Sequence, residues 1–212
     1  MGDLIEAGNT ALVNPFGAYA QEQASTNTLK GDLLKYGKGI WTIGKNDAIV
    51  QAGTTFSVDM NEILVGWQRW RDRKVTAANL GTIASGFRAP PRDTLGDDDK
   101  AKWETDKDGK PQDPWQFTSV VYMQDDDGEP VTFSTSSYGG RNAVTDLCKA
   151  YAGQMGGHPN ANPVVAIGTS TYKHKEYGIT HVPTLEIVGW TDDGDAPVKA
   201  APATSSKTKT KF

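Results

Sequence analysis

The sequence has little cysteine: Cys148 is the only one in 212 residues. A single thiol excludes an internal disulfide and a zinc site built from several cysteines. No apolar run is long enough to cross a membrane as a helix, and the N-terminus MGDLIEAGNT lacks the basic segment of a signal peptide. These absences predict a cytoplasmic protein that has no membrane partner.

Sequence motifs of nucleotide-binding and hydrolytic enzymes are also missing. The chain contains no GxGxxG, no GxxxxGK[ST] and no GxSxG pattern, and its three histidines lack the spacing of metal ligands. The aspartate runs at 97–99 and 125–127 lie in turn-rich stretches, where consecutive carboxylates alternate in direction and do not converge on one ion. We therefore predict a protein that is not an enzyme and that uses no metal or cofactor.

Charge and composition favour a strand-rich protein with a local binding surface. The net charge is -4, which argues against a wholly basic nucleic-acid binder. The 23 glycines and 11 prolines favour turns and short strands over a helical bundle. Hydrophobic residues make up 37% of the chain, so part of it is expected to stay outside the core.

Strand and helix patterns follow one another in a definite order. FTSVVYMQ and VTFSTSSY flank the turn-rich DDDGEP, which predicts a hairpin, and PVVAIGTSTY and HVPTLEIVGW predict a second hairpin. Between these hairpins, apolar residues recur at three- and four-residue steps, which predicts a helix at about residues 141–155 that is stopped by Gly156 and Gly157. Earlier strands are predicted in LLKYGKGIWTI, AIVQAGTTFSV and ILVGWQRW.

The order of strands, helix and final hairpin is that of an OB-fold. We predict a mainly β protein, with an OB-fold-like closed barrel over residues 30–190 and a charged Pro/Gly-rich loop insert at 84–114. About seven strand candidates are present where the basic fold has five, so either the first strand is broken or a hairpin is added. Residues 1–29 are predicted to be a flexible arm, and the low-complexity residues 191–212 a disordered tail.

The segment LVGWQRWRDRK, residues 64–74, combines two tryptophans with four cations. Because side chains alternate along a strand, Trp67 and Trp70 are predicted to face opposite ways. The apolar neighbours of Trp67 place it in the core, and Trp70 is placed on the surface beside Arg69 and Arg71; a one-residue bulge would reverse this. The cations have few acidic neighbours in sequence, so burial of this end is not expected. The alternative is that both rings are core and the arginines are ordinary edge-strand charges.

The local charge favours a binding surface. Residues 30–92 contain ten Lys and Arg against five Asp and Glu, a net charge of +5, with aromatic residues interleaved. Single-strand binders combine such a positive surface with aromatic rings that stack bases, worth roughly 1–3 kcal/mol per base. TYKHKEYG, at the turn of the last hairpin, is a second basic aromatic cluster, whose alternative is a solvated loop. The predicted nucleic-acid-binding residues are Tyr36, Lys38, Trp41, Trp67, Arg69, Trp70, Arg71, Arg73, Lys74, Arg88, Tyr172, Lys173 and Lys175.

Four segments carry a resemblance to a known group of proteins. GDLLKYGKGIW, LVGWQRW, DPWQFTSVVYM and YKHKEYGITHVPTLEIVGW, within residues 31–190, resemble segments of uncharacterised phage and prophage proteins. This resemblance implies a role in handling a phage genome, in the host cytoplasm. Phage single-strand binders usually end in an acidic tail with a terminal aromatic residue. This chain ends in Phe212, but the preceding charges are lysines, which puts a partner-recruiting acidic tail in doubt.

Together these patterns predict a non-enzymatic single-stranded DNA-binding protein of phage replication or recombination. Its expected partners are single-stranded DNA and replication or recombination proteins, and a homo-oligomer is left open. The alternative is a virion structural or decoration protein, in which the same aromatic residues would form a protein interface. Binding to oligonucleotides that weakens with salt would separate the two hypotheses.

Overall fold

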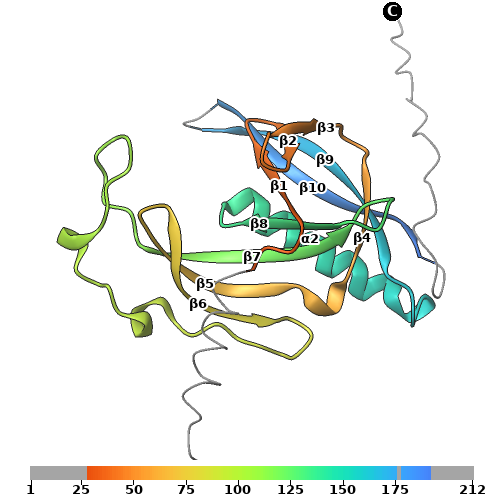
Figure 1. Ribbon diagram of the computed structural model, residues 1–212, viewed down its shortest axis with the longest axis horizontal. Helices are drawn as coiled ribbons and strands as arrows, with labels where there is room; N and C mark the ends of the chain where they lie inside the picture. Colours follow the sequence, from red (N-terminus) through yellow and green to blue (C-terminus); the bar gives the residue numbers. More distant parts are fainter. Residues whose placement is uncertain (1–27, 176–177, 192–212) are drawn as a thin grey trace, which may run out of the picture.

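The computed structural model describes residues 28–175 and 178–191. Most of the predicted N-terminal arm and all but Thr191 of the predicted tail therefore lie outside the described residues. The described part is mainly β, with ten strands and one α-helix, α2 (Tyr138–Gln154), which confirms the predicted class (Figure 1). Within these residues, no helix has both the length and the apolar character that crossing a membrane requires.

Eight strands precede α2 and two follow it, so the predicted order of strands, helix and hairpin is confirmed. Four short 3-10 helices lie between these elements: Met60–Glu62, Arg92–Leu95, Lys100–Lys102 and Met155–Gly157. The strands are β1 (Asp32–Gly37), β2 (Ile40–Ile43), β3 (Ala48–Val50), β4 (Thr55–Val58), β5 (Leu64–Arg71), β6 (Lys74–Thr82), β7 (Trp115–Gln124), β8 (Pro130–Thr135), β9 (Pro163–His174) and β10 (Gly178–Trp190).

The strands form one sheet that curls into a half-barrel (Figure 1). The order is β10-β9-β4-β7-β8-β1-β2-β3, and the β5–β6 hairpin joins β7 through β5. β4 is the narrow link in this sheet: Ser57 and Val58 pair with β7, and residues 55–57 pair with β9. The sheet thus has two wings, β9–β10 on one side of β4 and the remaining strands on the other.

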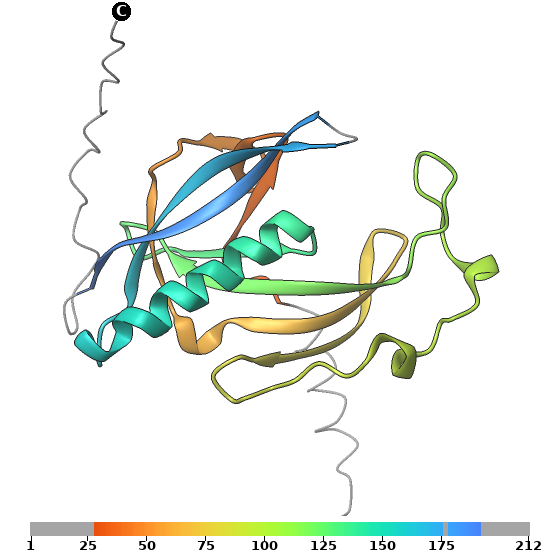
Figure 2. The same ribbon diagram turned by 180° about the vertical axis from the view of Figure 1, so that it is seen from behind.

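Helix α2 lies against the inner side of the curled sheet, between the β9–β10 wing and strands β5 and β7 of the other wing (Figure 2). Its residues Val144 and Leu147 are buried and join the main core, where they meet the fully buried Leu34, Val121 and Val165. Burial of this apolar stripe stabilises the docked helix, since packing rather than intrinsic propensity holds most protein helices.

The helix begins one turn earlier than the periodicity predicts. Ser137 caps it by accepting a hydrogen bond from the Gly140 amide at 3.1 Å. The two glycines that follow Tyr138 weaken the helical pattern in the sequence but fit the packing. A Cβ on Gly140 would lie 2.0 Å from Thr135 Oγ1, so only glycine fits here without a shift.

Several predicted strands are divided, and one strand was not predicted. LLKYGKGIWTI forms two strands because Lys38 and Gly39 turn the chain at φ 52° and 84°, and AIVQAGTTFSV is broken at Gly53, φ 92°. β6 was missed because VTAANLGT contains alanine, asparagine and glycine, which are depleted in strands. Its pairing with β5 along the whole hairpin supplies the order that local propensity lacks.

Candidate nucleic-acid interface

The β5–β6 hairpin ends in a tight basic turn. Asp72 and Arg73 occupy its two central positions with φ 49° and 60°, the left-handed pair that matches the twist of a two-residue hairpin. Arg73 and Lys74 are exposed, and neither forms an ion pair within the described part of the chain. The segment that combined tryptophans with cations is therefore a strand leading into a charged tip.

The β9–β10 hairpin ends in a second basic tip. Tyr172 has a relative exposure of 44%, and Lys173 and Lys175 are exposed. The β1–β2 turn, which carries the exposed Lys38, lies beside this hairpin, since Gly39 O accepts a hydrogen bond from Thr169 Oγ1 at 3.4 Å. Lys38 therefore belongs to the same side of the molecule as the second tip.

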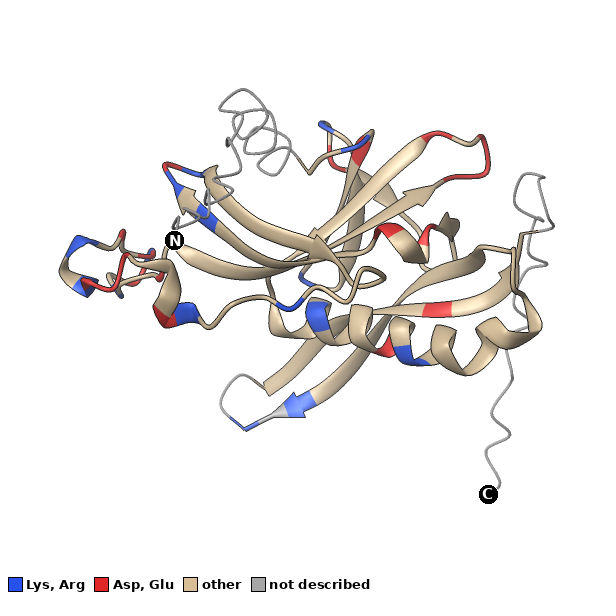
Figure 3. Cartoon of the chain, turned by 90° about the horizontal axis from the view of Figure 1, so that it is seen from below, with Lys and Arg blue, Asp and Glu red and all other residues tan. Residues whose placement is uncertain are grey.

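The two tips lie toward the same end of the molecule, although they are far apart in sequence. All three ribbon views place them toward one end of the longest axis, and Figure 3 shows Lys and Arg at both. The N-terminus of α2 points to the same end, and its first residue, Tyr138, has a relative exposure of 71%. Tyr138 was not among the predicted binding residues, because only the packing of α2 shows where this ring lies.

Trp67 and Trp70 differ in burial as predicted. Trp67 is half-buried: its Nε1 donates to Pro90 O at 2.9 Å, and its ring meets Phe117 edge-on at 5.3 Å. Trp67 is not part of the main core, so the predicted core position is corrected to a smaller aromatic layer under residues 87–90. Trp70 is the more exposed ring, with a relative exposure of 36%.

A one-residue bulge does occur in this hairpin, but on the partner strand. Arg69 pairs with Ala77 and Trp70 pairs with Val75, so Thr76 of β6 is the extra residue. Thr76 Oγ1 accepts from Arg69 Nε at 3.0 Å. Because β5 itself has no inserted residue, its two tryptophans keep their opposite faces.

Trp41 and Tyr36 are corrected from binding residues to core residues. Trp41 has a relative exposure of 2%, and its Nε1 donates to Gly168 O at 2.8 Å. Its ring packs against Tyr36 at 4.9 Å and against Phe133 at 5.2 Å. Tyr36 is half-buried, and its hydroxyl is enclosed. A base could reach the Trp41 ring only after the core opened, and the Tyr36 ring is held by its packing against that core.

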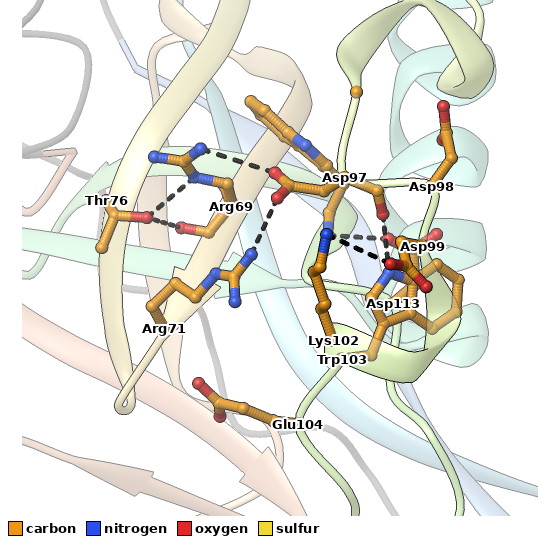
Figure 4. A network of polar contacts seen from close by, with 12 residues as sticks. Arg69, Arg71, Thr76, Asp97, Asp98, Asp99, Lys102, Trp103, Glu104 and Asp113 are labelled. Carbon is orange, nitrogen blue, oxygen red and sulfur yellow. Dashed lines mark hydrogen bonds and ion pairs between the residues drawn. The ribbon is translucent and has the colours of Figure 1, made fainter.

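Arg69 and Arg71 have an acidic partner that their neighbourhood in sequence does not show. Asp97, from the insert, accepts from Arg71 Nη2 at 2.7 Å and from Arg69 Nη1 at 3.4 Å (Figure 4). Its side chain has a relative exposure of 22%. The expectation that these cations have too few acidic neighbours is therefore wrong for two of the four, because a segment distant in sequence folds back onto β5.

Further polar contacts hold the insert in this position. Trp103 Nε1 donates to Asp97 O at 2.6 Å, and the Asp72 amide donates to Glu104 Oε1 at 3.0 Å. Arg92 forms a two-pronged contact with Asp113, at 2.7 Å from Nε and 2.7 Å from Nη2. The Glu104 contact fixes the loop predicted over residues 84–114, which also contains two 3-10 turns, against the base of the first tip, and the other contacts hold the loop's own conformation.

The ion pairs change the pKa of two groups in this network. Partial burial of Asp97 acts to raise its pKa, but the hydrogen bonds and charges of Arg69 and Arg71 outweigh burial and bring the pKa below its ordinary value. The hydrogen bond to Asp113 raises the pKa of Arg92 against the opposing effect of burial. Asp97 therefore stays ionised, and it occupies the guanidinium sites that a phosphate would use.

Arg88 and Arg141 differ in their surroundings. Arg88 is exposed at the start of the insert, where its Nη1 donates to Phe87 O at 3.3 Å. Arg141 lies on α2 with its guanidinium 5.6 Å from the Phe117 ring centre, and it was not predicted from sequence. Its Nε is enclosed and has no hydrogen-bond partner among the described residues. Arg88 is the more exposed of the two.

The adjacent carboxylates of the insert do not converge. Asp97 binds Arg69 and Arg71, Asp98 lies 3.2 Å from Arg92, and Asp99 lies 3.2 Å from Lys102. Over residues 28–175 and 178–191, no three side chains of His, Cys, Asp or Glu are grouped to share a metal ion. Asp97 instead attaches the insert to β5, whereas Asp98 and Asp99 pair with cations inside the insert.

Comparison with known proteins found no matching family model, no matching curated protein and no matching solved structure. The function of this chain is therefore inferred from its own surface. That surface presents two basic tips with exposed rings at Trp70, Tyr138 and Tyr172.

Proposed function

We propose that this protein binds single-stranded DNA, without catalysing a reaction, through the surface that joins its two hairpin tips. The observation that carries this proposal is that two basic aromatic tips both lie toward one end of the longest axis, on opposite sides of the body in Figure 3. The proposed binding residues are Lys38, Trp70, Arg73, Lys74, Tyr138, Tyr172, Lys173 and Lys175. Arg69 and Arg71 become additional phosphate sites when Asp97 is displaced.

The charged side chains and the aromatic rings contact different parts of the DNA strand. Lysine and arginine neutralise phosphates and release counterions, which makes affinity fall as salt rises. Exposed aromatic faces stack bases without reading their sequence, which requires bases that are not already stacked in a duplex. A preference for single strands over duplex follows from this arrangement.

The finer assignments belong to the same proposal. The curled β half-barrel with one helix before its last hairpin is compatible with an OB-type barrel, the fold that we propose. We place the protein in phage replication or recombination, in the host cytoplasm, with proteins of those processes as partners. The proposed role needs no membrane.

The test is fluorescence anisotropy on a labelled mixed-sequence oligonucleotide, single-stranded and duplex, at two salt concentrations. The wild-type protein is expected to bind the single strand more tightly and to lose affinity with salt. The double variants Arg73→Ala/Lys74→Ala and Lys173→Ala/Lys175→Ala should each weaken binding. Lys45→Ala/Lys107→Ala removes the same charge from exposed positions outside the proposed binding residues and serves as the matched control.

Two results would contradict the proposal. One is the absence of binding to the single strand at low salt, which would favour the virion structural or decoration role. The other is an equal loss of affinity in the control and in both tip variants, which would show that only net charge matters.

A further inference from the structure

A cavity of about 420 Å³ lies between α2 and the β9–β10 hairpin. Its helical side is a single stripe at four-residue spacing, formed by Tyr138, Asn142 and Asp146. Its sheet side is formed by alternate residues of two paired strands, so these side chains share one face. These residues are Ser170 and Tyr172 of β9, and Val182, Thr184 and Glu186 of β10.

Close packing at two glycines shapes the cavity walls. A Cβ on Gly139 would lie 2.7 Å from Val182 Cγ1, so the first turn of α2 rests directly on β10. A Cβ on Gly168 would lie 2.5 Å from Thr184 Oγ1, within the sheet wall. The cavity is therefore bounded by close-packed elements, and its volume falls in the range of about 300–1,000 Å³ that is usual for ligand pockets.

The chemistry changes along the cavity. At the tip end lie the exposed rings of Tyr138 and Tyr172, and the lysines of the β9–β10 tip follow directly. Asp146, eight residues along the helix, lies about 12 Å further in at the rise of an α-helix. Glu186 lies at the same inner end, because on β10 it is the lining residue farthest from the tip. A basic entrance thus leads past aromatic rings to carboxylates.

The inner carboxylates are accessible to a ligand. Glu186 is exposed. Asp146 pairs with Lys149 at 2.9 Å, but both side chains have relative exposures of about 70%. An exposed pair of this kind contributes little and exchanges readily with another donor. Carboxylate oxygens only accept hydrogen bonds, so they select a ligand that presents N–H groups.

We propose that this cavity holds one base of the bound strand and prefers bases that carry an exocyclic amino group. This inference rests on the proposed function and specifies its ligand. The phosphates would lie at the lysines of the tip, and the strand would pass between the tyrosines so that the base lies inward of them, with its amino edge toward Asp146 and Glu186. Unstacked bases are recognised in this way, by aromatic stacking together with hydrogen bonds to the base edge.

Cytosine and thymine separate this proposal from general stacking. Cytosine presents the N4 amino donor where thymine presents the O4 acceptor, and an acidic side chain accepts from cytosine N4. The probes are oligo(dC), oligo(dT) and oligo(dU) of equal length, and oligo(dU) controls for the thymine methyl group. Wild-type protein is expected to bind oligo(dC) at least about fivefold more tightly than the other two, the lower end of one good base contact.

Variants locate the preference within the protein. Asp146→Asn and Glu186→Gln should reduce the ratio of oligo(dC) to oligo(dU) affinity toward one. Asp126→Asn makes the same charge change in the exposed β7–β8 turn and should leave the ratio unchanged. Both cavity carboxylates are exposed, so thermal melts of these variants are expected to match the wild type.

The outcomes distinguish this inference from the proposed function. Equal affinity for the three oligonucleotides, or a cytosine preference that survives both cavity variants, overturns the base pocket and leaves single-strand binding intact. No binding to any of the three at low salt overturns the proposed function and the base pocket together.

Discussion

At Trp67, one indole joins three parts of the chain. It belongs to β5, packs edge-on against Phe117 of β7, and donates to the carbonyl of Pro90 in the insert. Gly81 of β6, which pairs with Val65, makes room for Phe87, since a Cβ there would lie 2.3 Å from that ring. Trp67 thus holds the insert over the hairpin, whereas Trp70, three residues on, is the more exposed of the two.

The two tryptophans should respond differently to truncation. Trp67→Ala removes the aromatic packing and the Pro90 hydrogen bond, so we expect a loss of about 2–4 kcal/mol in the free energy of unfolding. Trp70→Ala should cost less than about 1 kcal/mol and should instead weaken binding to a single-stranded oligonucleotide. Denaturant melts and anisotropy titrations of both variants check this. Equal destabilisation by the two variants would contradict the assignment.

Cys148 is half-buried against the core, and burial raises the pKa of its thiol. Because the thiolate is the reactive form, a raised pKa leaves little of it near pH 7.5. We expect iodoacetamide to modify the folded protein much more slowly than the same chain in denaturant, and the rate to rise steeply at alkaline pH. Rapid modification of the folded protein at pH 7.5 would show that this thiol is not protected.

Among the elements, the insert is the one held mainly by polar contacts. Its attachment to β5 depends on Asp97, which bridges two arginines while its own backbone adopts φ 57°. The lowered pKa of Asp97 means that its ion pairs are fully present above the unfolded pKa of about 3.9 and are lost as pH falls through the folded value. The insert should therefore loosen in acid.

Asp97→Asn is expected to release the insert while the sheet stays folded. Asparagine tolerates the left-handed backbone but cannot form the two ion pairs. Limited trypsin digestion at neutral pH should then cut faster within residues 100–110. Asp108→Asn, an exposed change of the same charge in the same loop, is the control. If the two variants are cut at the same rate, Asp97 is not the anchor.

Elements defined by local pattern could be predicted from the sequence, and those defined by distant contacts could not. The β7–β8 hairpin follows from DDDGEP, where Asp125 Oδ1 accepts from the Asp127 and Glu129 amides, and α2 follows from its apolar period. β6 has no such local signal. The burial of Trp41 depends on Gly168, and the pairing of Arg69 depends on Asp97. Both partners lie far along the chain, so composition alone suggested a larger binding surface than the fold presents.

At the scale of the whole molecule, the proposed interface depends on two hairpins that act on one strand of DNA. Each phosphate contact on single-stranded DNA adds about 0.7 to the steepness of log affinity against log salt. Removing Arg73 and Lys74, or Lys173 and Lys175, should lower that slope by about 1.4, and removing all four by about 2.8. A slope that changes for only one pair would show that the two tips do not share a strand.

The narrow link at β4 has a consequence for how the chain is made. Ser57 pairs with Val164, so one edge of β4 has no partner until the last hairpin has left the ribosome. Pairing across such a long stretch of sequence is slow, and an open strand edge is prone to aggregate in the meantime. Pulse-labelled hydrogen exchange during refolding should find β4 protected together with β9, after the β7–β8 hairpin. The nascent protein therefore depends on its final strands to close the edge that its first sixty residues leave open.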